Sequence, residues 1–293
     1  MTAYFLSILS GVFSAVIGIG YRIGSKGKVY PIQAALLLDA AGIIIFSSLG
    51  KWQYDLPASV WLCGIIAGLT QYAAIRLLRE ALQRGPLSPA WCAIGLSFIP
   101  VLIYCWFFRG ETPTVWQILS VCATVGAIVA ASIGNAKAAG NGQKLENKKA
   151  ALIYGILLIS ILFSSSVIYI ILKAASYIRY NDMTLLGCFG NQIMTITYLF
   201  LMLPSVFDLS LSNTWQFNKY FWFGGLLVAV GGIGSFGIQL LIMNAPAVVV
   251  FALSGVTSLL AASLTSVYVF HEKRTVYWYV TVLLAVAAIL CNR

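Results

Sequence analysis

The chain is poor in charged residues. Only 9% of its 293 residues are Asp, Glu, Lys or Arg, whereas soluble domains carry about 25% of these residues. The chain contains a single histidine. This scarcity excludes an ordinary soluble enzyme, and the 60% share of hydrophobic residues excludes a disordered chain. The mean hydropathy of +0.92 instead predicts an all-α membrane protein with very little mass outside the lipid bilayer.

The sequence also lacks the clusters that metal centres and active sites need. No two of its six cysteines have Cys-x-x-Cys spacing, which argues against a disulfide framework or a zinc site. With one histidine and no nucleophile beside a base, we expect no enzyme activity, no cofactor and no metal. The net charge of +10 does not indicate nucleic-acid binding, because the basic residues lie at the ends of apolar runs, where they reach lipid headgroups.

Ten apolar runs are present, and each predicts a membrane-spanning helix. At about 20 apolar residues per span, a chain of this length accommodates ten. Lipid offers no partner for unpaired backbone groups, so each run must be helical. The first run lacks a basic leader and a cleavage site, which indicates a retained helix. The predicted spans are residues 3–22, 31–50, 58–82, 87–108, 113–134, 150–174, 184–203, 220–243, 246–270 and 275–291.

One long polar segment, residues 135–149, divides these spans into two sets of five. It contains four lysines and no apolar periodicity, so we interpret it as a linker between residues 1–134 and 150–293. Because each half has an odd number of spans, the second half must enter the membrane from the opposite side. The sequence therefore predicts two inverted five-helix repeats, with one central site near the membrane midplane.

Short matches in the same order along both halves support a duplication. Placing Glu111 on Glu272 aligns Gly110 with His271. In the first and sixth spans, a Phe-Ser pair is followed eight or nine residues later by a cation, Arg22 or Lys173. We interpret these two cations as interfacial anchors, or as residues lining an entrance.

The motifs resemble a known repeat. Ala81–Ser88, then Pro100, then Gly110 and Glu111 before a Gly/Ala-rich helix, are similar to an EamA repeat of the drug/metabolite transporter superfamily. Residues 244–288 resemble this repeat less closely. The resemblance implies a ten-helix secondary transporter that works by alternating access. It does not define the substrate, because the superfamily carries amino acids, nucleotide sugars, organic cations and other metabolites.

Asp39 is the acidic residue predicted to lie in the middle of a span. A carboxylate there costs about 2.5–3.5 kcal/mol on insertion scales, so it should face a wet cavity or pair with a cation. It is a candidate for substrate recognition or proton coupling, and the alternative is a structural ion pair or a hydrogen bond between helices. Asn191 and Gln192 lie at nearly the same depth in the seventh span.

Arg76 lies inside the third span and has two interpretations. Its guanidinium can bind Asp39 or an anionic group of the substrate, since it holds carboxylates bidentately. It can equally pair with Glu80, four residues further along the helix. Gln71 and Tyr72 lie about one turn earlier.

Polar and aromatic residues elsewhere complete the predicted pocket. Ser235 and Gln239 in the eighth span are the counterparts of the third-span group. Trp91 lies deep within the fourth span, where it either lines a cavity or packs between helices. In the first case it would form an aromatic cage for a cation with residues of other spans, namely Tyr21, Tyr72, Tyr169 and Phe236.

We therefore expect a multi-pass transporter of a bacterial inner membrane, acting as a monomer or homodimer. Its cargo is a small polar or amphiphilic metabolite such as an amino acid, driven by a proton or another ion gradient. The alternatives are an organic-cation or drug carrier and, in a different class, a non-transporting assembly or lipid-handling component. The positive-inside rule places the linker in the cytoplasm, whereas the resemblance implies cytoplasmic termini, and both orientations remain open.

Overall fold

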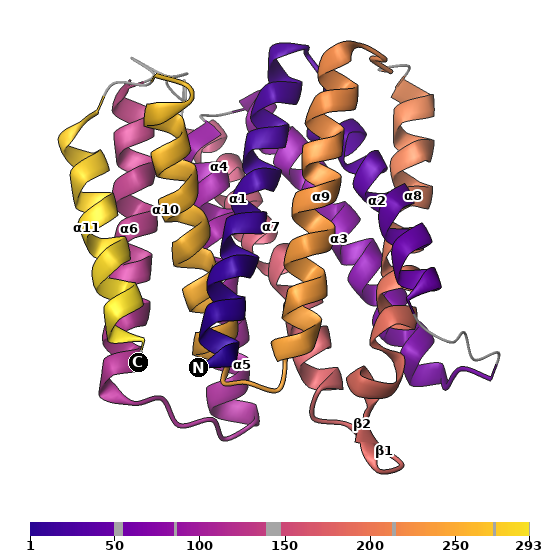
Figure 1. Cartoon of the computed structure of the whole chain (residues 1–293). Coiled ribbons are helices and arrows are strands. Elements are labelled where there is room, and N and C mark those ends of the chain that lie inside the picture. Colours follow the sequence, from indigo (N-terminus) through magenta and orange to yellow (C-terminus); the bar gives the residue numbers. More distant parts are fainter. Residues whose placement is uncertain (50–54, 85–86, 139–147, 213–214, 272–273, 293) are drawn as a thin grey trace.

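The computed structural model is a bundle of long helices (Figure 1), and it describes residues 1–49, 55–84, 87–138, 148–212, 215–271 and 274–292. Within these ranges, eight helices are long and apolar enough to cross a membrane. Two further apolar segments, Cys92–Phe108 and Val276–Cys291, are shorter. The prediction of an all-helical membrane protein is confirmed, with eight long helices and two shorter segments where ten full spans were expected.

Most helices follow the predicted spans, but the span predicted to end at residue 203 continues as a helix to Ser212. The first half contains α1 (Thr2–Lys26), α2 (Pro31–Ser48), α3 (Ala58–Arg84), α4 (Leu87–Gly95), α5 (Phe98–Phe108) and α6 (Val115–Ala138). The second half contains α7 (Lys148–Ala175), the hairpin strands β1 (Arg179–Tyr180) and β2 (Met183–Thr184), α8 (Leu185–Ser212), α9 (Lys219–Ile242), the π-helical turn η1 (Val248–Ala252), α10 (Leu253–Tyr268) and α11 (Val276–Cys291). The predicted linker of residues 135–149 is too long at both ends, because α6 continues to Ala138 and α7 begins at Lys148. The residues between them, 139–147, lie outside the described residues.

The predicted fourth span is interrupted, because Pro100 cannot complete a continuous helix. Proline has no N–H to donate to the carbonyl of Leu96 four residues earlier. The chain instead makes tighter bonds around this point, from Ser97 N to Ile94 O and from Ile99 N to Leu96 O. The expected single span of residues 87–108 is therefore wrong in this detail, since α4 ends at Gly95 and α5 begins at Phe98.

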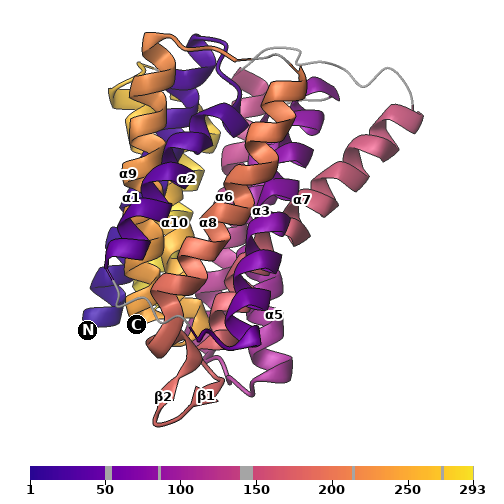
Figure 2. The same cartoon turned by 90° about the vertical axis from the view of Figure 1, so that its right-hand side faces the viewer.

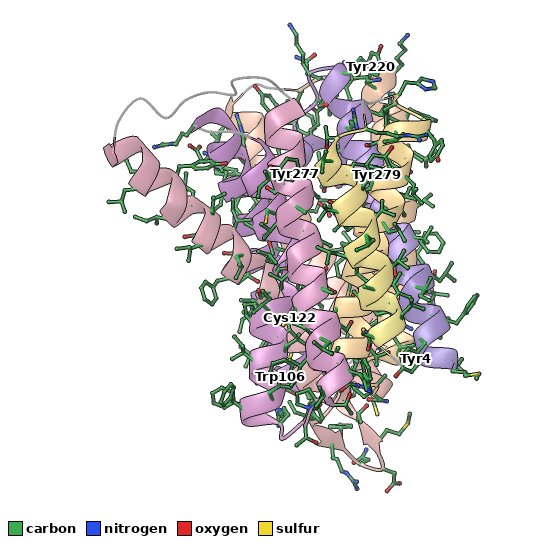
Figure 3. The ribbon with its side chains drawn as sticks, turned by 90° about the vertical axis from the view of Figure 1, so that its left-hand side faces the viewer. Tyr4, Trp106, Cys122, Tyr220, Tyr277 and Tyr279 are labelled. Carbon is green, nitrogen blue, oxygen red and sulfur yellow. The ribbon has the colours of Figure 1, made fainter. Side chains whose placement is uncertain are left out.

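Both chain ends lie at one end of the bundle, which we call the termini end (Figure 1). The opposite end, where α6 ends and α7 begins, is the linker end (Figure 2). Aromatic side chains mark both ends, with Tyr4 and Trp106 near the termini end and Tyr220, Tyr277 and Tyr279 near the linker end (Figure 3). This distribution is typical of aromatic belts at the two membrane surfaces.

The main helix contacts join the two halves of the chain. In the first half, α1 packs on α9 and α10, α2 packs on α8 and α9, and α3 packs on α7 and α8. The helices α6 and α11 form a further pair, visible side by side in Figure 3. The linker-end part of α7 leans away from the other helices (Figure 2).

Glycines allow α1 and α9 to approach closely. A Cβ atom on Gly20 would lie 2.5 Å from the carbonyl oxygen of Gly224, and one on Gly224 would lie 2.8 Å from that of Gly20. Because backbone atoms cannot move aside as a flexible side chain can, only glycine fits at this crossing. Small residues at helix interfaces serve the same purpose in other membrane proteins.

We expect Gly20→Ala to destabilise the protein by about 2 kcal/mol, because the added methyl group forces the two backbones apart. Gly18→Ala is the matched control, since a Cβ on Gly18 meets nothing within 4 Å. Thermal unfolding in detergent measures both variants. Equal melting temperatures for the two would contradict this account of the crossing.

Candidate functional site

Asp39 is completely buried in α2, with 0% of its surface exposed. In the described part of the chain, neither of its carboxylate oxygens has a hydrogen-bond partner. Tyr21 of α1 and Tyr198 of α8 lie within range of its charge. A buried polar group without a partner is rare in proteins and calls for a specific explanation.

Tyr198 belongs to a chain of aromatic rings from both halves of the protein. The ring of Tyr198 stacks on Phe46 at 5.8 Å and meets Phe236 edge-on at 6.4 Å. Phe236 stacks in turn on Tyr169 at 6.0 Å, and Tyr169 contacts Phe251 at 5.3 Å. Tyr169 and Phe236, two residues of the predicted aromatic cage, are thus brought together.

Ser235 lies in a cluster of hydroxyl groups between α1, α9 and α10. Its Oγ atom is 2.7 Å from that of Ser14 and 3.1 Å from that of Ser10. The hydroxyl group of Ser10 also lies 3.3 Å from that of Ser254. Hydroxyl groups that bond to one another across helices hold the helices together in the membrane, so this cluster has its own partners.

Arg76 belongs to a charged network between α3 and α8. Its guanidinium lies 3.4 Å from Asp208 and 3.7 Å from Glu80. Arg79 shares Asp208 at 3.5 Å and lies over the ring of Tyr30 at 4.7 Å. The predicted pairing with Glu80 is present, and Arg76 makes a shorter contact with Asp208, which the sequence does not predict. Two carboxylates already occupy Arg76.

The other predicted site residues lie on the expected helices. Gln71 in α3 and Gln239 in α9 each have a buried side-chain oxygen without a partner among the described residues. Gln192 in α8 is buried, and Asn191 beside it is partly buried. Trp91 lies in α4, but its side chain is outside the described part of the structure.

The predicted Arg76 group includes Tyr72, which lies within range of the charges of Arg76, Arg79 and Asp208. No described contact joins this network to Asp39. The predicted set therefore divides into a buried carboxyl group with two tyrosines within range of its charge, a hydroxyl cluster and a separate charged network.

Lys173, near the end of α7, is a second buried charge. From the sequence it is an interfacial anchor or a residue lining an entrance. The interpretation as an anchor is wrong. Its side chain is 1% exposed, and its ammonium group lies 3.0 Å from the Glu111 carboxylate. The same group donates to the carbonyl oxygens of Met243 at 3.0 Å and Ala245 at 2.6 Å. All three N–H bonds of the ammonium group are therefore used.

Glu111 is the centre of this network at the termini end. Besides Lys173, it accepts hydrogen bonds from the Tyr177 hydroxyl group and, at 2.8 Å, from the Ala247 N–H. The preceding Gly110 has φ = +68°, a left-handed conformation that favours glycine. The network joins the loop after α5 to the end of α7 and to the turn between α9 and η1.

The pKa of Glu111 is held below its ordinary value. Burial alone would raise this pKa, but the hydrogen bonds from Tyr177 and Ala247 and the charge of Lys173 together outweigh burial. Because the pKa is lower in the folded state, the network stabilises the protein above the ordinary pKa of the carboxyl group. This stability is lost as the pH falls through the folded-state pKa.

We therefore expect the wild-type protein to lose thermal stability more steeply than Glu111→Gln as the pH is lowered from about 4.5. Melting temperatures in detergent between neutral and acidic pH measure the difference. The two curves should converge at low pH, where the wild-type carboxyl group is also neutral. Parallel curves over the whole range would contradict the assignment.

Comparisons with known proteins agree with this fold. Residues 1–133 match the EamA-like transporter family. Among solved structures, 27 chains match. One of them is a crystal structure that superposes with a TM-score of 0.73 at 16% sequence identity, covering 99% of this chain and 96% of that chain. At this identity the likeness shows the fold alone. Curated proteins give no match in sequence.

Proposed function

We propose, from the match of residues 1–133 to the EamA-like transporter family, that the chain is a gradient-driven secondary transporter of the inner membrane of a bacterium. It carries a small polar metabolite that bears an ammonium group. Ten membrane segments in two inverted five-helix repeats enclose one central site, and the repeats rock against each other to give alternating access.

The packing of the helices supports the inverted repeat. Each half has five segments when α4 and α5 are counted as one segment and η1 and α10 as another. If the segments of the two halves are exchanged in order, α1 takes the place of α7, and α3 takes the place of α9. The contact of α1 with α9 then becomes that of α7 with α3, and the contact of α1 with α10 becomes that of α7 with α4 and α5. The pairs α2 with α8 and α6 with α11 exchange into themselves.

A backbone feature supports the same exchange. The alignment of Glu111 with Glu272 places Gly110 on His271, and both residues have a left-handed backbone, with φ = +68° and +54°. Such a conformation is uncommon for a residue other than glycine. Its recurrence at aligned positions in the two halves argues for a shared ancestral turn.

The single observation that carries the substrate class is the buried Asp39 carboxyl group, which has no hydrogen-bond partner among the described residues and acts on the nearby Tyr21 and Tyr198 through its charge. A carboxylate accepts hydrogen bonds, and the faces of aromatic rings attract cations. An ammonium group satisfies both kinds of surroundings, whereas a substrate anion would be repelled. Organic cations and amino acids both carry this group, so it unites the two cargo classes that the sequence suggests.

The same carboxyl group provides coupling. It can hold a proton or an ammonium group, but not both, so binding of one displaces the other. Exchange of substrate for protons across the membrane then follows from competition at Asp39, without a second ion site.

The Glu111–Lys173 network acts as a closed gate at the termini end. It ties the loop of the first half to α7 and to the α9–η1 turn of the second half. Rocking of the halves must break these contacts before the site opens to this end. By the exchange of halves, Arg22 and Glu272 take the corresponding roles at the linker end; Glu272 lies outside the described residues.

A binding screen tests the proposal. Purified protein in detergent is mixed with amino acids, amines and quaternary ammonium compounds, and with carboxylic acids of matched size. An ammonium ligand at 100 times its dissociation constant should stabilise the protein by about 2.7 kcal/mol and release protons into a weakly buffered solution. If only anions bind, or if no ligand class binds at all, the proposed substrate class is wrong.

A further inference from the structure

A pocket of about 350 Å³ lies at the linker end, outside the proposed transport site. It is formed between the end of α1, the start of α9 and Phe270, which lies two residues after the end of α10. Its lining residues are Ile23, Lys26, Lys219, Tyr220, Phe223 and Phe270. Apart from the two lysines and the tyrosine hydroxyl group, every lining side chain is a hydrocarbon.

The walls of this pocket are fixed by tight backbone packing. Gly20 and Gly224 form the close crossing of α1 and α9 just below it, and Gly27 lies against the ring of Tyr220. Asn218 caps the start of α9 by accepting from two backbone N–H groups and donates to the Gly27 carbonyl oxygen at 2.9 Å. The pocket is thus a built feature of the helix crossing.

Two lysines, Lys26 and Lys219, supply positive charge to the lining of the pocket. Lys26 Nζ lies 5.1 Å from the Phe270 ring centre, and Arg22 stacks over the same ring at 4.1 Å. Lys219 Nζ lies 5.3 Å from the ring of Tyr220, at the positive end of the α9 helix dipole. Among the described residues that line the pocket, none is Asp or Glu. The two lysine side chains are exposed and available to an anion.

The pocket opens toward lipid. The side chain of Phe223 is 57% exposed and that of the neighbouring Trp222 is 58% exposed, on a helix apolar enough to cross a membrane. Two ammonium groups above an apolar wall, at the level of the membrane surface, match a lipid phosphate above its acyl chain. Basic pockets between membrane helices bind acidic headgroups in this way.

We propose that this pocket binds an anionic phospholipid, with its phosphate group between Lys26 and Lys219 and an acyl chain along Ile23 and Phe223. The bound lipid bridges α1 and α9 at the linker end. A free phosphate ion would gain the two charges but not the apolar wall, so the lipid is the occupant that uses the whole pocket.

Native mass spectrometry of the delipidated protein, titrated with phosphatidylglycerol, tests the proposal. Each lysine should contribute about fivefold in affinity, so Lys26→Gln/Lys219→Gln should bind phosphatidylglycerol about 25-fold more weakly than wild type. Lys28→Gln is the matched control, because Lys28 is an exposed lysine of the same region that does not line the pocket. Wild-type affinity should also fall with rising salt.

Two further ligands separate the possible sources of the anion. Neutral phosphatidylcholine should bind wild type and the double variant equally weakly, and soluble glycerophosphate should not compete with phosphatidylglycerol at similar concentrations. An equal loss of affinity in Lys28→Gln would mean a diffuse surface charge and would overturn the proposal. Competition by glycerophosphate at equal strength, or undiminished lipid binding by the double variant, would overturn it as well.

Discussion

Asp39→Asn should abolish substrate accumulation driven by a proton gradient while leaving the fold intact. The amide keeps the shape of the carboxyl group but cannot take up and release a proton. We expect gradient-driven uptake to fall at least about 100-fold, since a lost ionic contact of 2–3 kcal/mol corresponds to one to two powers of ten and loss of coupling adds to it. Uptake into proteoliposomes with an imposed pH difference measures this effect.

The stability of the same variant should not fall. The wild-type protein keeps a buried carboxyl group that lacks a partner among the described residues, which is costly, so a neutral amide removes no stabilising contact. The exposed Asp55, outside the helices, provides the control Asp55→Asn, which should transport normally. Normal gradient-driven uptake by Asp39→Asn would refute the coupling role, and a large loss of melting temperature would instead indicate a structural role.

Lys173→Met should have the largest effect on stability. It removes the ammonium group that fills the space between the Glu111 carboxylate and two backbone carbonyl oxygens. Removing one partner of a buried ion pair costs about 3–5 kcal/mol, because the other charge stays buried without compensation. Thermal unfolding in detergent measures this cost, and Lys173→Met/Glu111→Gln should recover part of it.

The thiol group of Cys105 reports whether the gate also opens. Cys105 is fully buried, and its carbonyl oxygen accepts a hydrogen bond from the Glu111 N–H. In a variant that keeps Cys105 as its single cysteine, Lys173→Met should speed up labelling by a water-soluble maleimide about tenfold or more, since an opening cost reduced by 1.4 kcal/mol already gives tenfold. Arg179→Gln, at the same end, is the control. An unchanged rate of Cys105 labelling in Lys173→Met would mean that the Glu111–Lys173 network is a structural contact, and it would refute the role of this network as a gate.

The helices could be predicted from the sequence because hydropathy acts locally. A run of about 20 apolar residues leaves the backbone no choice but a helix in lipid, so the limits of α1 or α9 are readable from residue order alone. The helix break at Leu96 and Ser97 also has its cause in the sequence, at Pro100. A hydropathy profile does not detect it, because the profile does not depend on whether a residue has a backbone N–H. The π-helical turn at Val248–Ala252 follows Pro246 in the same way.

The site was only partly predictable, because side-chain partners depend on distant segments. Asp39 was identifiable, since a carboxyl group within an apolar run is conspicuous whatever surrounds it. The partner of Arg76 was not, because Asp208 lies 132 positions away on α8. Lys173 resembled an anchor because it lies at the end of an apolar run. The signal for a partner of Lys173 was present in the alignment of the two halves. It pairs Lys173 with Arg22 and places a glutamate at the same position in a loop of each half, Glu111 and Glu272.

The packing of the two halves against each other has a consequence for the synthesis and membrane insertion of the protein. When residues 1–138 have been synthesised, α1 and α3 are inserted without α9, α7 and α8, their main partners. The glycine face of α1 is therefore exposed to lipid until α9 has been synthesised and inserted, about 200 residues after α1. Neither half can assemble correctly alone, so each should be degraded when produced singly. The two halves produced together as separate chains should find each other in the membrane.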